Sequence, residues 1–268
     1  MDTATVSLTI AAVNDAPVNT IAASYSTNED ISVALTGLSV ADLDAAAGNI
    51  SVNLSVTSGS ITATTGGGVA VTNSGTASIT LIGTLASINA YLASGATPVY
   101  VPATNASGAV TLTMTTSDLG NTGTGGALTD TDTRTITITA VNDAPVNTLP
   151  VAQTTNEDTS KAITGLSITD VHAGAASMTV TLAVTNGTLT VTGGTATITN
   201  SGTNSVTLTG SAAQINATLA SNVTYVPITH FSGAATLTMT SSDNGNTGAG
   251  GTLTDVDALT INVTAVAD

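Results

Sequence analysis

Acidic and amide side chains cluster at both ends of an apolar segment near the middle of this chain. The segment spans residues 133–141, and its β-branched side chains predict a β-strand. The flanking residues are Asp118, Asp130 and Asp132 before the segment, and Asn142 and Asp143 after it. Carboxylate and amide oxygens are the ligands that Ca²⁺ prefers. These residue types at the two ends of a strand therefore indicate calcium binding.

Similar clusters recur along the whole chain. The candidate calcium ligands are Asp15, Glu29, Asp30, Asp42, Asp44, Asp118, Asn121, Asp130, Asp132, Asn142, Asp143, Glu157, Asp158, Asp170, His172, Asp243, Asn246, Asp255 and Asp257. Asp and Asn also favour turns, because their side chains bond to nearby backbone groups. We favour metal binding over turn chemistry alone, because the clusters are expected to converge in space.

Composition excludes several classes of partner. The chain of 268 residues has 17 acidic and 2 basic residues and a net charge of −15, so nucleic acid and anionic membrane are disfavoured. It contains no cysteine, so neither disulfides nor thiol chemistry can operate, and bound metal is the obvious alternative staple. We find no signal peptide and no apolar run long enough to insert into a membrane.

The sequence contains internal repeats, which define the folding units. Residues 3–15 match residues 131–143, so the chain begins with the last strand of a repeat whose body is absent. We expect residues 1–15 to be this strand, residues 16–143 to be a first complete repeat, and residues 144–268 to be a second. Met1 stands where the repeat has Thr, so the chain looks like a piece of a longer protein.

Within each repeat, short alternating segments such as 50–56 and 178–184 predict strands separated by turns. About seven or eight short strands in each repeat are typical of an antiparallel β-sandwich. The one helical pattern of each repeat lies at residues 84–92 and 211–219, with Thr84 and Ser211 in the position of the N-cap. We therefore predict an all-β fold of two tandem antiparallel sandwiches, each with one short helix.

Strand directions assign the acidic clusters to the ends of each sandwich. We call the end where the chain enters a repeat its upper end. The lower end of the first repeat is expected to hold Glu29, Asp30, Asn142 and Asp143, and the upper end of the second to hold Asp170, His172, Asp243, Asp255 and Asp257, with Asn246 nearby. Carboxylates this close repel by several kcal/mol at a moderately low dielectric. Such an oxygen-rich set suits Ca²⁺ far better than Zn²⁺.

The motifs VNDAP, NED and D-x-D occur in an order that resembles the calcium-binding order of cadherin repeats. Together with INA, GAATLT and GNTG, they are more similar still to cadherin-like tandem repeats of giant bacterial surface adhesins, including those with RTX tails. This resemblance covers almost the whole chain. It implies a cadherin-like or Ig-like sandwich, calcium at the junctions between repeats, and an extender role in cell adhesion and biofilm on the bacterial surface. His172 departs from the pattern, because Asp44 occupies its position in the first copy.

Other functions are weighed against this one. His172 and His230 occupy different repeat positions, so they share no catalytic constellation and we expect no enzyme activity. The glycine-rich loops lack the lysine and the helix of a phosphate-binding loop. A glycan- or protein-binding module is the alternative, but aromatics are few and both copies keep the same loops. The expected partners are neighbouring repeats, and the segment from Thr3 to Ala12 could form filaments by donating a strand to another molecule.

Overall fold

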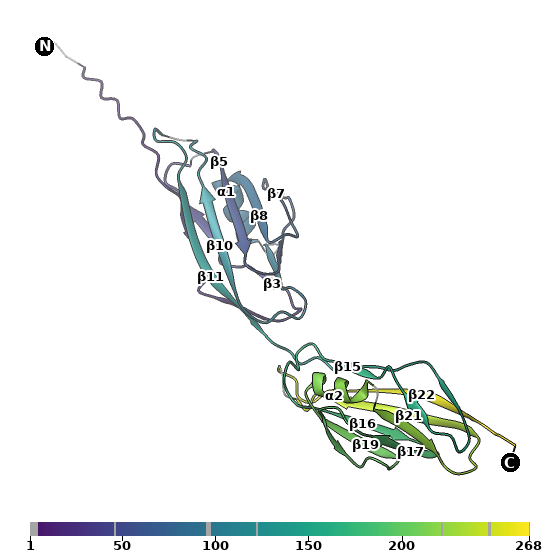
Figure 1. Cartoon of the computed structure of the whole chain (residues 1–268). Coiled ribbons are helices and arrows are strands. Elements are labelled where there is room, and N and C mark those ends of the chain that lie inside the picture. Colours follow the sequence, from purple (N-terminus) through teal and green to yellow (C-terminus); the bar gives the residue numbers. More distant parts are fainter. Residues whose placement is uncertain are drawn as a thin grey trace. The chain divides into compact units, whose positions relative to one another are not determined.

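The computed structural model describes residues 5–45, 47–94, 98–121, 123–220, 222–245 and 248–267. The chain forms two compact units, Met1–Ala140 and Val141–Asp268, which we call unit 1 and unit 2 (Figure 1). Over the described residues, each unit consists of short strands and one short helix. The prediction of an all-β fold with two tandem sandwiches is confirmed. The division between the units follows Ala140, so residues 141–143 belong to unit 2.

Unit 1 has its strands in three sheets. The elements are β1 (Val18–Thr20), β2 (Tyr25–Asn28), β3 (Val33–Ala34), β4 (Ser39–Ala41), β5 (Asn49–Val56), β6 (Ser60–Thr62), β7 (Ala70–Thr72), β8 (Ser78–Thr84), α1 (Leu85–Ala93), β9 (Val99–Val101), β10 (Gly108–Ser117) and β11 (Thr129–Thr139). The large sheet has the order β2-β11-β10-β5-β8-β7, and the smaller sheets are β3-β9-β6 and β1-β4.

Unit 2 repeats this arrangement. Its elements are β12 (Val146–Thr148), β13 (Gln153–Asn156), β14 (Lys161–Ile163), β15 (Ser167–Thr169), β16 (Met178–Val184), β17 (Gly187–Val191), β18 (Thr197–Thr199), β19 (Ser205–Gly210), α2 (Ala212–Leu219), β20 (Val223–Pro227), β21 (Gly233–Ser242) and β22 (Thr254–Thr264). The large sheet has the order β13-β22-β21-β16-β19-β18, and the smaller sheets are β14-β20-β17 and β12-β15.

One pairing in each large sheet is parallel rather than antiparallel. β2 runs parallel to β11, and β13 runs parallel to β22. The other strand pairs described are antiparallel, as predicted. Because β2 and β11 point the same way, both end at the lower end of unit 1. This geometry confirms that the residues following β2 lie at that end.

Alternating side chains fill the core of each sandwich. In β5, Ile50, Val52, Leu54 and Val56 are buried, while the residues between them face outward as Ser and Asn. This period of two follows from the pleat of the strand. The core of unit 1 joins residues of the large sheet with residues of the two smaller sheets, and unit 2 has an equivalent core. Burial of these aliphatic side chains is the main driving force for folding in each unit.

The helices form at the predicted positions because their first turns are capped. Thr84 accepts a hydrogen bond from the backbone N–H of Ser87 at the start of α1. Ser211 and Gln214 form a reciprocal capping box at the start of α2. Each helix is short and buries one apolar stripe, as Ile215 does in α2. In unit 1 the helix α1 contacts β4 and β8, and in unit 2 the helix α2 contacts the equivalent strands β15 and β19.

Residues 5–12 form no strand in this structure, although their sequence matches β11. Val6, Leu8 and Ile10 are 85–88% exposed. These side chains alternate as in a strand, but here they have no sheet to pack against. Thr3 and Ala4 of the predicted strand lie outside the described residues, so strand donation by this segment stays a prediction. Neither helix of the described residues is long and apolar enough to cross a bilayer.

Candidate cation sites at the upper end of each unit

In unit 1, the loop after β4 brings two carboxylates to the upper end. Asp42 Oδ1 accepts hydrogen bonds from the backbone N–H groups of Asp44 at 3.1 Å and Ala45 at 2.9 Å, which closes a tight turn. Asp44 Oδ2 accepts a hydrogen bond from the backbone N–H of Asp15 at 3.0 Å. The pairing of β1 with β4 holds these segments together. Hydrogen bonds thus join Asp42 to Asp44, and Asp44 to the backbone of Asp15, while calcium binding by these residues stays a prediction.

Two oxygens of this cluster are suited to a cation. Asp42 Oδ2 and Asn14 Oδ1 are buried and accept no hydrogen bond from the described residues. A buried polar oxygen without a partner is costly, and a bound cation would remove that cost. Burial is the main cause that raises the pKa of Asp42, and the adjacent Asp44 carboxylate raises it further. The arrangement therefore fits a cation that binds oxygen ligands.

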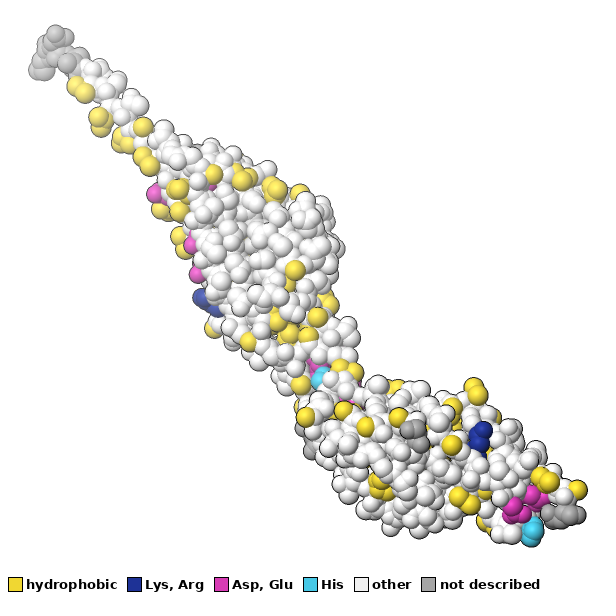
Figure 2. Space-filling model, in the orientation of Figure 1, with side chains coloured by type: hydrophobic (Ala, Val, Ile, Leu, Met, Phe, Trp, Pro, Cys, Tyr) yellow, Lys and Arg dark blue, Asp and Glu magenta, His cyan; other side chains and the backbone are white. Residues whose placement is uncertain are grey.

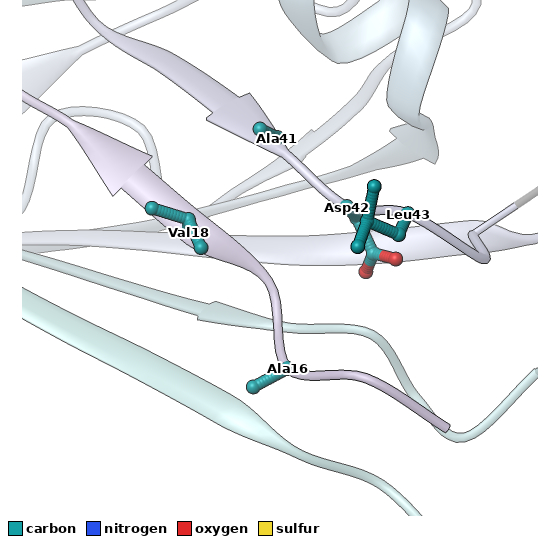
Figure 3. Close-up of a pocket in the computed structure, with 5 residues that line it drawn as sticks. All are labelled: Ala16, Val18, Ala41, Asp42 and Leu43. Atoms are coloured by element: carbon teal, nitrogen blue, oxygen red, sulfur yellow. The ribbon is translucent and has the colours of Figure 1, made fainter. Parts of the chain in front are cut away.

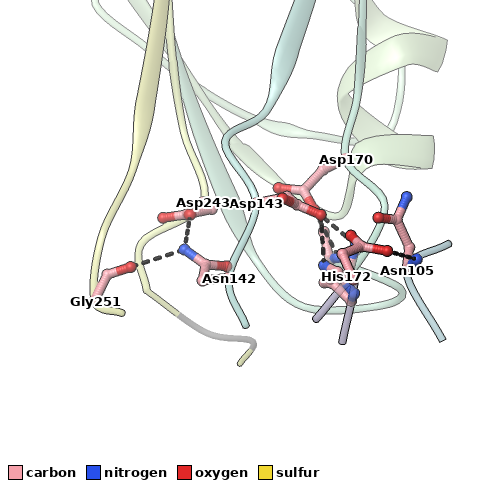
Figure 4. Close-up of polar contacts among 9 residues, drawn as sticks. Asn105, Asn142, Asp143, Asp170, His172, Asp243 and Gly251 are labelled. Atoms are coloured by element: carbon pink, nitrogen blue, oxygen red, sulfur yellow. Dashed lines mark hydrogen bonds and ion pairs between the residues drawn. The ribbon is translucent and has the colours of Figure 1, made fainter. Parts of the chain in front are cut away.

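The matching site in unit 2 differs at one position. Asp170 Oδ1 accepts hydrogen bonds from the backbone N–H groups of His172 and Ala173, both at 2.9 Å. Asp170 Oδ2 is buried and accepts no hydrogen bond from the described part of the chain. His172 stands where unit 1 has Asp44. Its Nδ1 lies 3.4 Å from Asp143 Oδ2 (Figure 4). The imidazole thus lies beside the Asp143 carboxylate, at a position where unit 1 has the carboxylate of Asp44.

Asp118 and Asp243 are buried and are surrounded by N–H donors. Asp243 Oδ1 accepts hydrogen bonds from the backbone N–H groups of Gly245 at 2.8 Å and Leu253 at 2.9 Å, and Oδ2 accepts one from the Asn142 amide (Figure 4). Burial alone raises the pKa of both aspartates, but these hydrogen bonds outweigh it and hold the pKa below the usual range. Both carboxylates are therefore stabilised as anions by the protein itself.

Other predicted ligands at the upper end hold neighbouring strands together. Asp130 Oδ2 accepts a hydrogen bond from the backbone N–H of Asn19, and Asp255 Oδ2 accepts the equivalent bond from Asn147, each at 2.7 Å. These bonds tie β1 to β11 and β12 to β22. Asn121 donates its amide to backbone carbonyl oxygens and is exposed. Asp132 and Asp257 lie on β11 and β22, opposite Met114 and Met239 in register.

The remaining predicted ligands lie at the lower end of each unit. The backbone N–H of Glu29 bonds to the Thr139 carbonyl oxygen, and the equivalent bond joins Glu157 to Thr264. Asp30 Oδ1 accepts a hydrogen bond from the Asn105 backbone N–H at 3.0 Å. These groups lie far along the strands from the cluster at Asp42. Asn246, also predicted as a ligand, lies outside the described residues.

In unit 2, Asp158 takes the position that Asp30 has in unit 1. It accepts a hydrogen bond from the His230 backbone at 3.0 Å, and its Oδ2 lies 3.4 Å from His230 Nδ1. His230 is exposed in a turn after β20, and His172 lies in the cluster at the upper end. The two histidines are therefore separated and each faces one aspartate.

Among the described residues, no three His, Cys, Asp or Glu side chains come together as a metal-binding group. The carboxylates meet in pairs, and a cation would need amide, backbone or further carboxylate oxygens as well.

A shallow pocket of about 170 Å³ adjoins Asp42 and is otherwise lined by Ala16, Val18, Ala41 and Leu43 (Figure 3). Charged side chains are sparse on the surface in view (Figure 2). Of the described residues that line this pocket, Asp42 is the one with a titratable side chain.

The sequence did not reveal the role of Asn14. Its side-chain Nδ2 donates to Asp118 Oδ2 at 2.6 Å and to the Gly126 carbonyl oxygen at 2.7 Å. Asn142, predicted only as a metal ligand, donates in the same way to Asp243 and Gly251 (Figure 4). The recurrence of V-N-D before each repeat was the available signal, but the partner lies about a hundred residues away.

No family model matches the chain, and no curated protein matches it. Solved structures of cadherin extracellular domains do, at low similarity. Domains 1–5 of protocadherin gamma B2 match over 96% of this chain and 42% of theirs, with 14% identity and a TM-score of 0.39. Mouse cadherin-23 EC22-24 matches over 95% of this chain and 67% of its own, with 18% identity and a TM-score of 0.38.

Human protocadherin-24 EC1-2 matches over 95% of this chain and 100% of its own, with 16% identity and a TM-score of 0.33. The chain spans 34–49% of the first three structures found.

Proposed function

We propose that this chain is part of a calcium-stabilised extender in a large adhesin on the bacterial cell surface. In this function, tandem sandwiches project a distal adhesive domain away from the cell, and the chain itself catalyses no reaction. The observation that carries the proposal is the cluster at the upper end of both units. In each, an aspartate (Asp42 or Asp170) has one oxygen in a turn, and its other oxygen is buried with no hydrogen-bond donor among the described residues.

In unit 1, Asp42, Asp44 and the amide oxygen of Asn14 would hold the ion. Calcium would neutralise the two adjacent carboxylates, which raise the energy of the folded state when both are ionised. In unit 2, Asp170 and Asp143 would do the same, with His172 beside them. The low charge density elsewhere and the repeated fold support a spacer, because a spacer needs units that are alike.

The ligands predicted from sequence at the lower end of each unit also remain part of the proposal. Glu29 and Asp30, or their counterparts in a preceding repeat, would complete a site at the upper end of the repeat that follows. A cation shared in this way would stiffen the short segment that joins the repeats. The neighbouring repeats would then be the main partners of this chain, and the chain would act outside the cell, in adhesion and biofilm.

Calcium titration of thermal stability tests the proposal. Extracellular calcium modules bind at roughly 10⁻⁴–10⁻³ M, so 1 mM Ca²⁺ on a ~0.1 mM site adds about 1.4 kcal/mol. We expect the melting temperature of unit 1 to rise between excess EGTA and calcium, and Asp42→Asn to abolish the rise. K⁺ at equal ionic strength is the control. An equal rise in the variant or with K⁺ would contradict specific binding.

Asp42→Asn also has an expected effect without calcium. The pKa of Asp42 is raised above its ordinary 3.8, so its contribution to stability is present below that pH and is lost as the pH rises through the folded-state pKa. The neutral amide removes this loss. In EGTA at pH 7 the variant should therefore melt at or above the wild-type temperature, as measured by calorimetry.

The extender role has its own measurement. Small-angle scattering of the full chain gives its maximum dimension with EGTA and with millimolar calcium. We expect calcium to narrow the distribution of dimensions toward the extended form, and Asp143→Ala to remove that effect while each unit stays folded. A distribution that is independent of calcium would contradict the extender function even if calcium binds.

A further inference from the structure

The glycine-rich loop of each unit holds the chain segment that enters that unit. In unit 1, the Asn14 N–H bonds to the Thr124 carbonyl oxygen at 3.1 Å, and the Thr124 N–H bonds to the Ala12 carbonyl oxygen at 3.0 Å. Val13 and Thr124 thereby form a parallel bridge. In unit 2, Val141 and Ala249 form the same bridge.

The asparagine side chain adds a buried contact to this backbone bridge. Asn14 and Asn142 are each 6% exposed, and their side-chain partners Asp118 and Asp243 are 3% and 2% exposed. Each amide nitrogen donates to the aspartate and to a glycine carbonyl oxygen of the loop. Hydrogen bonds to a buried carboxylate are stronger than neutral ones.

The aspartate is also the centre of the loop. Asp118 Oδ1 accepts hydrogen bonds from the backbone N–H groups of Gly120 at 2.9 Å and Leu128 at 2.8 Å, which lie at the two ends of the loop. With Oδ1 bonded inside the loop, Oδ2 is left for Asn14. Three neutral N–H donors thus bond to this carboxylate and stabilise its negative charge without a metal.

The backbone of the loop fits closely against the entering segment. A Cβ added to Gly123 would lie 2.6 Å from the Asn14 nitrogen and 2.7 Å from the Val13 carbonyl carbon. Gly248 has the same φ region and the same distances to Asn142 and Val141. A larger residue at either position would push the segment out, because real Cβ contacts are longer than this.

We propose that the loop and its buried aspartate form a receptor for the Val-Asn segment that enters each repeat, and that this asparagine clamp works without a cation. Its partner is thus the terminal segment of the preceding repeat. Asp118 and Asp243 are positioning residues of the clamp rather than calcium ligands. The clamp also fixes the amide of Asn14, so that its Oδ1 remains available to the cation of the proposed function.

Two consequences follow for a chain of repeats. Removal of calcium leaves the entering segment attached to its unit, so loss of metal changes the stiffness of a junction before the segment is released. The last strand of one repeat is also followed within a few residues by a segment held in the next. Tension along the chain therefore acts on the clamp directly.

Hydrogen exchange of the full chain in excess EGTA tests the clamp independently of calcium. In the wild type we expect the Asn142 amide to be protected. Asn142→Ala should lower its protection roughly 10- to 100-fold, the range expected when a hydrogen bond to a charged group is lost. Asn142→Asp, which keeps the shape but replaces the donor, should lower it at least as much. Asn262→Ala, an exposed change on β22, is the matched control and should have no effect.

Amides of the β16–β21 ladder report whether the variants are folded, and Asn14→Ala repeats the test in unit 1. Protection at position 142 that persists in both variants would overturn the clamp. So would wild-type protection that appears only when calcium is added, because the segment would then be held by metal. The comparison of the variants with the wild type is made in EGTA, so it does not depend on whether the extender function is correct.

Discussion

Substitution of Gly248 by alanine gives a quantitative test of how closely the loop fits the entering segment. The added Cβ would lie 2.6 Å from the Asn142 nitrogen, and the residue would keep φ near +75°. The left-handed backbone costs an L-residue about 1–2 kcal/mol. Relief of the clash requires the segment to move, which breaks one backbone hydrogen bond of about 1 kcal/mol and weakens a charge-assisted bond of about 1.5–3 kcal/mol. If the charge-assisted bond is lost outright, these terms sum to about 3.5–6 kcal/mol.

Gly202→Ala, in the same unit but outside the clamp, is the matched control for this experiment. Gly202 has φ of +88°, and a Cβ there meets nothing within 4 Å. It should therefore lose only the backbone cost, about 1–2 kcal/mol. The assay is urea unfolding in EGTA, with peptide-level hydrogen exchange to assign the transition to unit 2. Equal losses in the two variants, or a loss in Gly248→Ala confined to the loop amides, would refute the argument from close fit.

Three further outcomes are expected. Tyr225→Phe should lower the free energy of unfolding by about 1 kcal/mol, because the Tyr225 hydroxyl donates a 2.8 Å hydrogen bond to a carbonyl oxygen. Tyr100→Phe should leave it nearly unchanged, since that buried hydroxyl has no hydrogen-bond partner among the described residues. Chemical denaturation measures both variants. Ser211→Ala should destabilise unit 2 by about 1 kcal/mol through loss of the N-cap, as measured by calorimetry. The pKa values of Asp118 and Asp243 are lowered below 3.8, so their contribution to stability is present above that pH and is lost as the pH falls through the folded-state values. The melting temperature in EGTA should therefore fall between pH 5 and pH 2, and it should fall less steeply in the Asp243→Asn variant.

The elements of the fold could be predicted because their signals are local. Alternation in segments such as β5 reports the pleat of a strand, and Thr84 or Ser211 marks the start of a helix within one turn. The repeated motifs also predict the assignment of Glu29 and Asp42 to opposite ends of a sandwich. The parallel pairing of β2 with β11 was not predicted, because partners far apart in sequence decide strand direction in a sheet.

The roles of the acidic side chains could be predicted only in part. Residue type identifies Asp42, Asp118 and Asp243 equally as candidate ligands, because each is an aspartate in a recurrent loop. The tertiary structure separates them. Asp118 and Asp243 are surrounded by N–H donors from their own loop and from an asparagine 104 and 101 residues away. Asp42 keeps one buried oxygen that no donor of the described residues reaches. Sequence determines which oxygens are present, and the fold determines which of them the protein itself already satisfies.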